Sequence, residues 1–96
     1  MLRLGAILTE YGVLDFFDTF DNNYWKRFKS TSVMVLEQHY QSTLGQWLER
    51  KYQLWNSSSG LRQWFISQGV EYMCDMSLEI MLYQYDRLNY LIGEHT

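Results

Sequence analysis

Residues 61–91 read LRQWFISQGVEYMCDMSLEIMLYQYDRLNYL, a length of about eight helical turns without a proline. Most of the helical wheel drawn for this stretch is apolar, and Tyr72 and Met76 both lie on its apolar part. A helix that is apolar over more than half of its girth must be covered from several sides. The sequence therefore predicts one long central helix. Its acidic residues fall within a single arc of about 80°: Glu71, Asp75, Glu79 and Asp86.

A second amphipathic pattern covers residues 33–55. Its apolar positions fall within about 120° of the wheel, and glutamines dominate the opposite side. The loop sequence NSSSG at residues 56–60 separates this pattern from the later one, and Ser58 or Ser59 can cap the second helix. Because so short a loop joins neighbouring antiparallel helices, we expect an αα-hairpin of residues 33–55 and 61–91.

The N-terminal third predicts one or two shorter helices that pack across this hairpin. Residues 2–20 combine helical spacing with Gly5 and Gly12, and each glycine costs a helix about 1 kcal/mol relative to alanine, which favours a helix in two pieces. Residues 21–23, Asp-Asn-Asn, are typical of a turn or helix cap. The predicted architecture is thus all-α, with residues 1–96 forming a single helical domain.

The composition limits the class of function. The net charge is −3, which is a poor match for a protein whose main task is to hold a phosphate backbone. Aromatic residues make up 18% of the chain, a share that suits a protein interface as well as a small core. No stretch approaches the roughly 18 apolar residues of a membrane span, and the N-terminus lacks a cleavage site. We therefore expect a soluble, intracellular (cytoplasmic) protein.

The lone cysteine, Cys74, cannot form an intrachain disulfide, and on an apolar helix it is predicted to be a small buried hydrophobe. A homodimer is also expected, in preference to a monomer. Three helices around so apolar a last helix would leave part of its surface in water, and a two-fold partner would cover it.

Motifs of catalysis are absent from the sequence. It contains no phosphate-cradling glycine loop, no nucleophile elbow and no paired metal ligands at helical spacing. Asp15, Asp18 and Asp21 recur every third residue, but they lack the glycine that a calcium loop needs, so they are predicted to line a solvated helix edge. His39 is expected to be exposed and structural. Neither a metal, a cofactor nor an enzymatic activity is predicted.

The function that fits these observations best is protein–protein interaction without catalysis, as in an adaptor, an inhibitor or an assembly chaperone. The partner would bind the acidic stripe of Glu71, Asp75 and Glu79, or an aromatic-rich surface that includes Trp47 and Trp64. Carboxylates one turn apart repel one another by a few tenths of a kcal/mol per pair. The stripe is therefore either plain solvated surface or a docking site for a basic partner.

Two alternatives from other classes stay open. In residues 24–29, YWKRFK, cations alternate with rings, and rings can stack on bases while cations meet phosphates. A nucleic-acid-associated regulator would need its cations in one continuous patch, and its binding would weaken steeply with salt. The residues assigned to this site are Trp25, Lys26, Arg27, Lys29, Arg50 and Lys51. A small enzyme or ligand binder would instead need a pocket between helices, lined by tyrosines with a few convergent polar groups.

Overall fold

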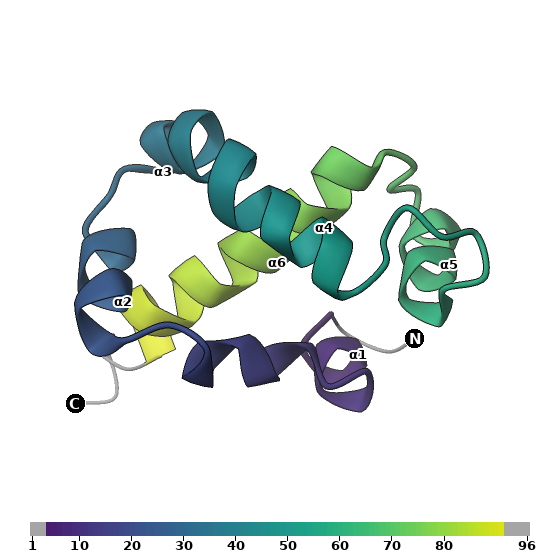
Figure 1. The fold of residues 1–96 in the computed structure, drawn as a ribbon, viewed down its shortest axis with the longest axis horizontal. Helices are drawn as coiled ribbons and strands as arrows, with labels where there is room; N and C mark the ends of the chain where they lie inside the picture. The colour runs from purple at the N-terminus through teal and green to yellow at the C-terminus, as the bar shows by residue number, and fades with distance from the viewer. Residues whose placement is uncertain (1–3, 92–96) are drawn as a thin grey trace.

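The computed structural model describes residues 4–91, apart from the side chains of Leu14, Tyr90 and Leu91, and every regular element in this range is a helix (Figure 1). The predicted all-α class is confirmed. Among the described helices, none combines the length and the apolar character needed to cross a lipid bilayer.

The N-terminal third folds into three short pieces: α1 (Leu4–Glu10), the 3-10 helix η1 (Val13–Asp18) and α2 (Asn22–Lys29). Gly12 separates the first two pieces with a φ of +68°, a left-handed conformation that glycine adopts without steric cost. The Asp21 carboxylate caps α2 by accepting a hydrogen bond from the Tyr24 backbone N–H at 2.8 Å. The predicted break at residues 21–23 is confirmed, and so is a division of the first segment into two pieces.

The middle of the chain is one continuous helical run: α3 (Val33–Val35), the π-helix η2 (Leu36–Gly45) and α4 (Gln46–Lys51). Ser32 caps the run by accepting a hydrogen bond from the Val35 N–H. The run ends four residues before the predicted end at residue 55. Gln53 adopts a φ of +52°, and the Leu54 N–H closes back on the Glu49 carbonyl at 2.9 Å. This closure is a Schellman motif, built here without the usual glycine.

The predicted single helix over residues 61–91 is wrong. It is divided into α5 (Gly60–Ser67), α6 (Met73–Asp86) and the π-helix η3 (Arg87–Leu91). Gly69 has a φ of +89°, and the Val70 N–H bonds to the Phe65 carbonyl at 2.9 Å, so α5 ends in a second Schellman motif. A helical wheel records only which positions of the sequence are apolar. It cannot detect that one residue, here Gly69, adopts a left-handed backbone conformation and ends the helix. The predicted cap at Ser59 is confirmed.

The close hairpin of residues 33–55 and 61–91 is not the arrangement observed. Figure 1 shows α6 running through the middle of the fold and crossing the η2–α4 run, with α5 set to one side. The crossing is close at Gly45, where a Cβ atom would stand 3.4 Å from both Ser77 Oγ and Met81 Cε. Gln41 Nε2 donates a hydrogen bond to the Cys74 carbonyl at 2.8 Å beside the same crossing.

The hydrophobic core draws on every helix of the described chain except α3 and η3. Its aromatic part is centred on Trp25, whose ring lies 5.3 to 5.7 Å from those of Phe16, Phe20 and Phe28. The Trp25 indole N–H donates to the Phe17 carbonyl at 3.1 Å. Met76, Ile80 and Met81 of α6 complete the centre, and all three are fully buried.

Two predictions of burial are wrong. Cys74 is exposed, and Tyr72 keeps 70% of its side-chain surface in water. The error at Tyr72 came from treating residues 61–91 as one helix, whereas Tyr72 lies just before α6. Cys74 lies within α6 and is exposed, while the other apolar residues of α6 are buried or half-buried within one chain. The exposed apolar surface that led us to expect a dimer is thus absent from α6, and the homodimer stays a prediction.

Replacing Gly69 with alanine is expected to lower the free energy of unfolding by about 1 kcal/mol, because a left-handed conformation costs an L-residue roughly that much. The added Cβ meets no atom within 4 Å, so backbone strain accounts for the whole effect. Gln53→Gly is the reciprocal variant and should raise stability by up to about 1 kcal/mol. Urea unfolding followed by tryptophan fluorescence measures both. Equal stability of all three proteins would contradict the two left-handed turns.

Met76→Asp should lower the free energy of unfolding by about 4 kcal/mol or more, because it places an unpaired carboxylate in the core. Tyr72→Asp is the matched control, and since Tyr72 is exposed we expect a change within about 0.5 kcal/mol. Thermal unfolding followed by circular dichroism compares them. Similar melting of the two variants would show that the boundary at the start of α6 is misplaced.

Candidate functional site

The predicted acidic stripe lies at the beginning of α6. Asp75 and Glu79 are exposed one helical turn apart, and Glu71 is exposed in the turn that leads into the helix. The positive end of the helix dipole stabilises Asp75 in the first turn. The strongly exposed ring of Tyr72 lies between these carboxylates in the sequence. We call Glu71, Tyr72, Asp75 and Glu79 together the α6 acidic surface.

The two tryptophans predicted to bind a partner are partly committed to the core. Trp47 of α4 is half-buried, and its ring contacts Phe20 at a centroid distance of 5.2 Å. Trp64 of α5 is also half-buried, with its ring 5.3 Å from that of Phe65. They lie on different helices, and the packing of each fixes a large part of its ring. Each therefore offers only its outer edge to a partner.

Trp55 is the exposed tryptophan that the sequence patterns missed. It keeps 60% of its surface in water, although the helical wheel placed it on the buried face of residues 33–55. The wheel failed because the helix ends at Lys51, so the periodicity no longer applies four residues later. The loop sequence that follows directly was the one available signal that this residue could lie outside the helix.

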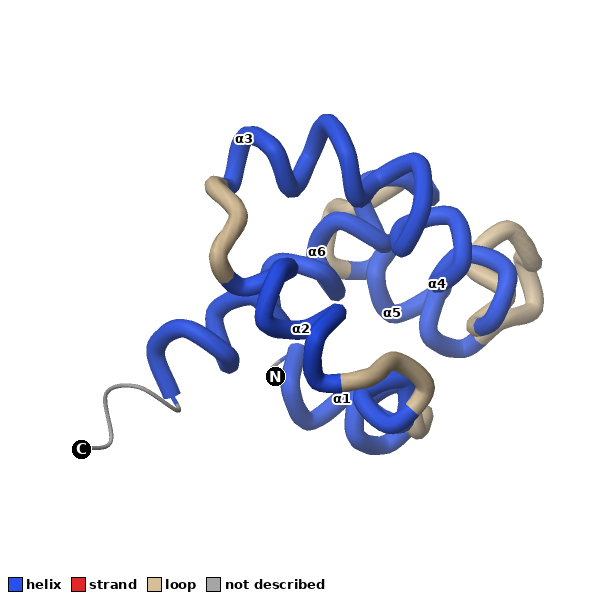
Figure 2. Tube along the Cα trace, turned by 60° about the vertical axis from the view of Figure 1, so that its left-hand side comes forward, coloured by secondary structure: helices blue, strands red, loops and turns tan. Residues whose placement is uncertain are grey.

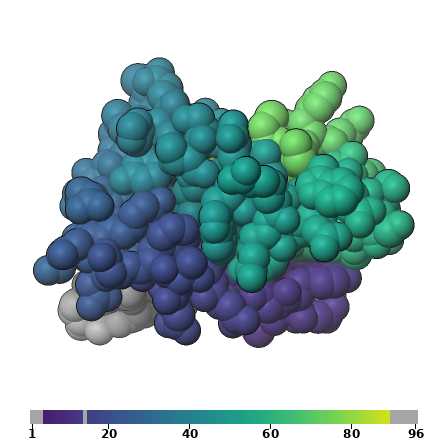
Figure 3. Space-filling view, viewed as in Figure 1, coloured from purple at the N-terminus to yellow at the C-terminus, as the bar shows by residue number. Residues whose placement is uncertain are grey.

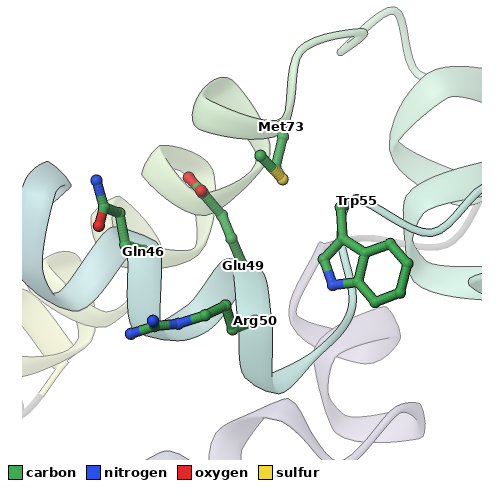
Figure 4. A pocket seen from close by; sticks show the side chains of 5 residues that line it. All are labelled: Gln46, Glu49, Arg50, Trp55 and Met73. Atoms are coloured by element: carbon green, nitrogen blue, oxygen red, sulfur yellow. The ribbon is translucent and has the colours of Figure 1, made fainter.

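Trp55 forms one wall of a pocket with a volume of about 210 Å³, lined by Gln46, Glu49, Arg50, Trp55 and Met73. Figure 4 shows the Glu49 carboxylate between Gln46 and Met73, with the indole at the far end. Glu49 is nearly buried and accepts a hydrogen bond from Ser77 Oγ at 2.7 Å. The volume is below the range of about 300–1,000 Å³ typical of small-molecule sites. The pocket therefore suits one side chain of a partner better than a substrate.

The basic segment at residues 24–29 is divided between core and surface. Trp25 is only 7% exposed, so its ring cannot stack on a base without leaving the core. Lys26, Arg27 and Lys29 are exposed on α2. The other two cations predicted for a nucleic-acid patch, Arg50 and Lys51, are exposed on α4, and Figure 1 shows α2 at the left and the end of α4 toward the right.

Two tyrosines have perturbed acidities, and both serve the fold. Burial raises the pKa of Tyr24 to about 12, with Tyr40 adding to the rise and Arg27 opposing it. Burial also raises the pKa of Tyr52, and Asp15 adds to that rise. The Tyr52 hydroxyl donates to the Val13 carbonyl at 2.9 Å. Neither phenol is ionised near neutral pH, so neither acts as a base there.

The repeated aspartates do not form a metal site in the described part of the chain. No group of three or more His, Cys, Asp or Glu side chains is gathered there. Asp21 is occupied as the cap of α2, and Asp15 and Asp18 are exposed on η1, as predicted for a solvated edge. His39 is exposed, also as predicted.

The raised pKa of Tyr24 predicts a loss of stability in alkali. Below about pH 10 the phenol is neutral in both the folded and the unfolded state. Between about pH 10 and 12 the unfolded chain loses the proton that the folded chain keeps, so the free energy of unfolding falls as pH rises. Urea unfolding across this range should show a shallower fall for Tyr24→Phe than for the native sequence. Identical pH profiles would contradict the burial of this hydroxyl.

Comparisons of this chain with protein-family models, with curated proteins and with solved structures found no match.

Proposed function

We propose that this chain is a non-catalytic interaction protein that binds a cationic segment of a partner protein on the α6 acidic surface. The observation that carries the proposal is the exposure of Tyr72 beside three exposed carboxylates. The roles of adaptor, inhibitor and assembly chaperone all fit this activity. A cytoplasmic location and a homodimer remain predictions alongside it.

The type of side chain at this surface supports binding to a protein. Tyrosine and tryptophan are enriched among the residues that contribute most to protein interfaces. Tyr72 is the most exposed of the large apolar side chains in the described chain, and Trp55 is also largely exposed. Met73, the residue after Tyr72, lines the same pocket as Trp55. The start of α6 thus contributes to both the pocket and the α6 acidic surface.

The charge of this surface supports a cationic partner. Asp75 and Glu79 repel each other by a few tenths of a kcal/mol, and a lysine or arginine between them would turn that repulsion into attraction. The face of the Tyr72 ring attracts the same cations through its quadrupole. A partner segment rich in lysine or arginine can therefore form ion pairs with the carboxylates and a cation–π interaction with the Tyr72 ring.

The alternatives receive less support. A nucleic-acid site on residues 24–29 needs an exposed ring for stacking, and Trp25 is buried. A substrate site was expected to be lined by tyrosines. The pocket beside Trp55 has no tyrosine in its lining, and neither has a second pocket lined by Asn22, Trp25, Lys26, Lys29 and Leu88.

The test is affinity purification from the native host with the triple variant Glu71→Lys, Asp75→Lys, Glu79→Lys and a nuclease-treated duplicate. A protein partner should survive nuclease and be lost with the triple variant. Tyr72→Ala should weaken the binding of that partner by on the order of tenfold or more, measured by titration with the purified partner. Binding should also weaken as salt is raised, since exposed charges are screened.

The matched control is Glu10→Lys, Asp18→Lys, Glu37→Lys, which reverses three exposed carboxylates elsewhere. Both triple variants change the net charge from −3 to +3, so only the position of the reversal differs. Thermal melting verifies that both variants fold. Retention of the partner by the α6 variant, or equal loss in both variants, would exclude the α6 acidic surface as the docking site.

A further inference from the structure

The helical run that begins at Ser32 opens with three apolar residues in water. Val33 and Val35 are each close to half exposed, and Met34 is 67% exposed. The next residue, Leu36, is fully buried and anchors the start of the run to the core. The exposed side chains are therefore held outward by the fold, since the cap at Ser32 and the anchor at Leu36 fix them on either side.

Three cations precede this apolar group by a few residues. Lys26, Arg27 and Lys29 are all exposed on α2, and they outnumber the two exposed carboxylates that flank the segment, Asp21 and Glu37. Lys26 and Lys29 line a single depression of about 230 Å³ together with Asn22, Trp25 and Leu88. Lys26 and Lys29 thus border the same region of solvent.

The cations and the apolar group lie at the same end of the molecule. Figure 1 places α2 and α3 at the left, and Figure 2, with that side turned forward, shows them joined by a short loop. In the space-filling view of Figure 3, the surface around α3 projects at the upper left, above that of α2. We call Lys26, Arg27, Lys29, Val33, Met34 and Val35 the α2–α3 tip.

The chemistry of the α2–α3 tip favours lipid over nucleic acid. Bases are recognised by exposed aromatic rings, whereas Trp25 is in the core and Tyr24 packs on Phe20 with ring centroids 4.6 Å apart. The side chains that do reach solvent beside the cations are aliphatic or a thioether. Such side chains enter the boundary between headgroups and acyl chains, while basic residues beside them are attracted to anionic headgroups.

We propose that the α2–α3 tip binds the surface of an anionic lipid membrane. Lys26, Arg27 and Lys29 contact the lipid phosphates and carboxylates, and Met34 with its two valine neighbours enters the headgroup region. This site uses no residue of the α6 acidic surface, which begins on the opposite side of Figure 1. A membrane-bound molecule therefore keeps its acidic surface free, and either site can fail in experiment without affecting the other.

The test is co-sedimentation with vesicles of equal parts phosphatidylcholine and phosphatidylserine, with pure phosphatidylcholine vesicles alongside. The native protein should bind the first and not the second. Lys26→Glu, Lys29→Glu should weaken binding by about 25-fold or more, since each basic residue near an anionic surface contributes roughly fivefold. Met34→Ser should weaken binding on the order of tenfold, and this factor should be nearly the same at low and high salt because the lost contact is apolar.

Two control variants test whether vesicle binding depends on the α2–α3 tip itself or only on the net charge and exposed apolar side chains of the whole protein. Arg50→Glu, Lys51→Glu makes the same change in net charge on exposed residues of α4, and Ile66→Ser removes an exposed apolar side chain from α5. Both should bind as the native protein does. The proposal is overturned if the native protein does not bind phosphatidylserine vesicles or if Met34→Ser binds them as well as the native protein does. It is also overturned if Arg50→Glu, Lys51→Glu weakens vesicle binding as much as Lys26→Glu, Lys29→Glu does. Binding of polyuridylate that depends on Lys26 and Lys29 but not on Met34, without vesicle binding, would assign the tip to nucleic acid.

Discussion

The close crossing of η2–α4 and α6 at Gly45 is the contact on which the rest of the fold depends. A Cβ atom at Gly45 would stand 3.4 Å from Ser77 Oγ and Met81 Cε, at the near limit of van der Waals contact, so the two helices touch at this point. Hydrogen bonds beside the crossing hold the two helices against sliding, one from Gln41 to the Cys74 carbonyl and one from Ser77 to Glu49. Because the helices are close here, the largest buried side chains of both can meet, and the shorter N-terminal helices close the remaining side of the core.

Polar groups at the other end of α6 oppose this packing. Gln84 is fully buried, and neither atom of its amide has a hydrogen-bond partner among the described residues. Such burial costs on the order of 1–3 kcal/mol. One turn later the Arg87 guanidinium lies 4.4 Å from the centroid of the Phe17 ring, and a cation over a ring recovers part of that cost. The C-terminal half of α6 is therefore held by rings and apolar contacts, together with a hydrogen bond from the Tyr85 hydroxyl to the Thr31 carbonyl.

Sequence patterns predicted the all-α class and the first residues of several helices. Helix starts were predictable because a capping side chain bonds to a backbone N–H only about three residues away. Asp21 caps α2 as expected, and Ser59, one of the two serines expected to cap the later helix, caps α5. Helix ends were harder to predict. The reversals at Gln53 and Gly69 depend on backbone conformations that no periodicity records, and both errors carried over to the candidate site. Through them, Trp55 and Tyr72 were assigned to buried helix faces. Glu71, Asp75 and Glu79 were placed on the surface correctly, because an unpaired carboxylate is costly to bury. Glu49, on the glutamine-rich side of the wheel, is instead nearly buried and accepts a hydrogen bond from Ser77.

The structure keeps its charges apart. Three exposed cations lie on α2 at the left of Figure 1, and three exposed carboxylates lie at and just before the start of α6, to the right of them. The two surfaces therefore have opposite local charge despite the small net charge of the protein. Near any charged surface the protein therefore experiences a torque, which turns it before contact and raises the share of collisions that arrive in one orientation. This orientation increases the rate of association. The electrostatic interaction that causes it acts over about one Debye length, roughly 8–10 Å at physiological ionic strength.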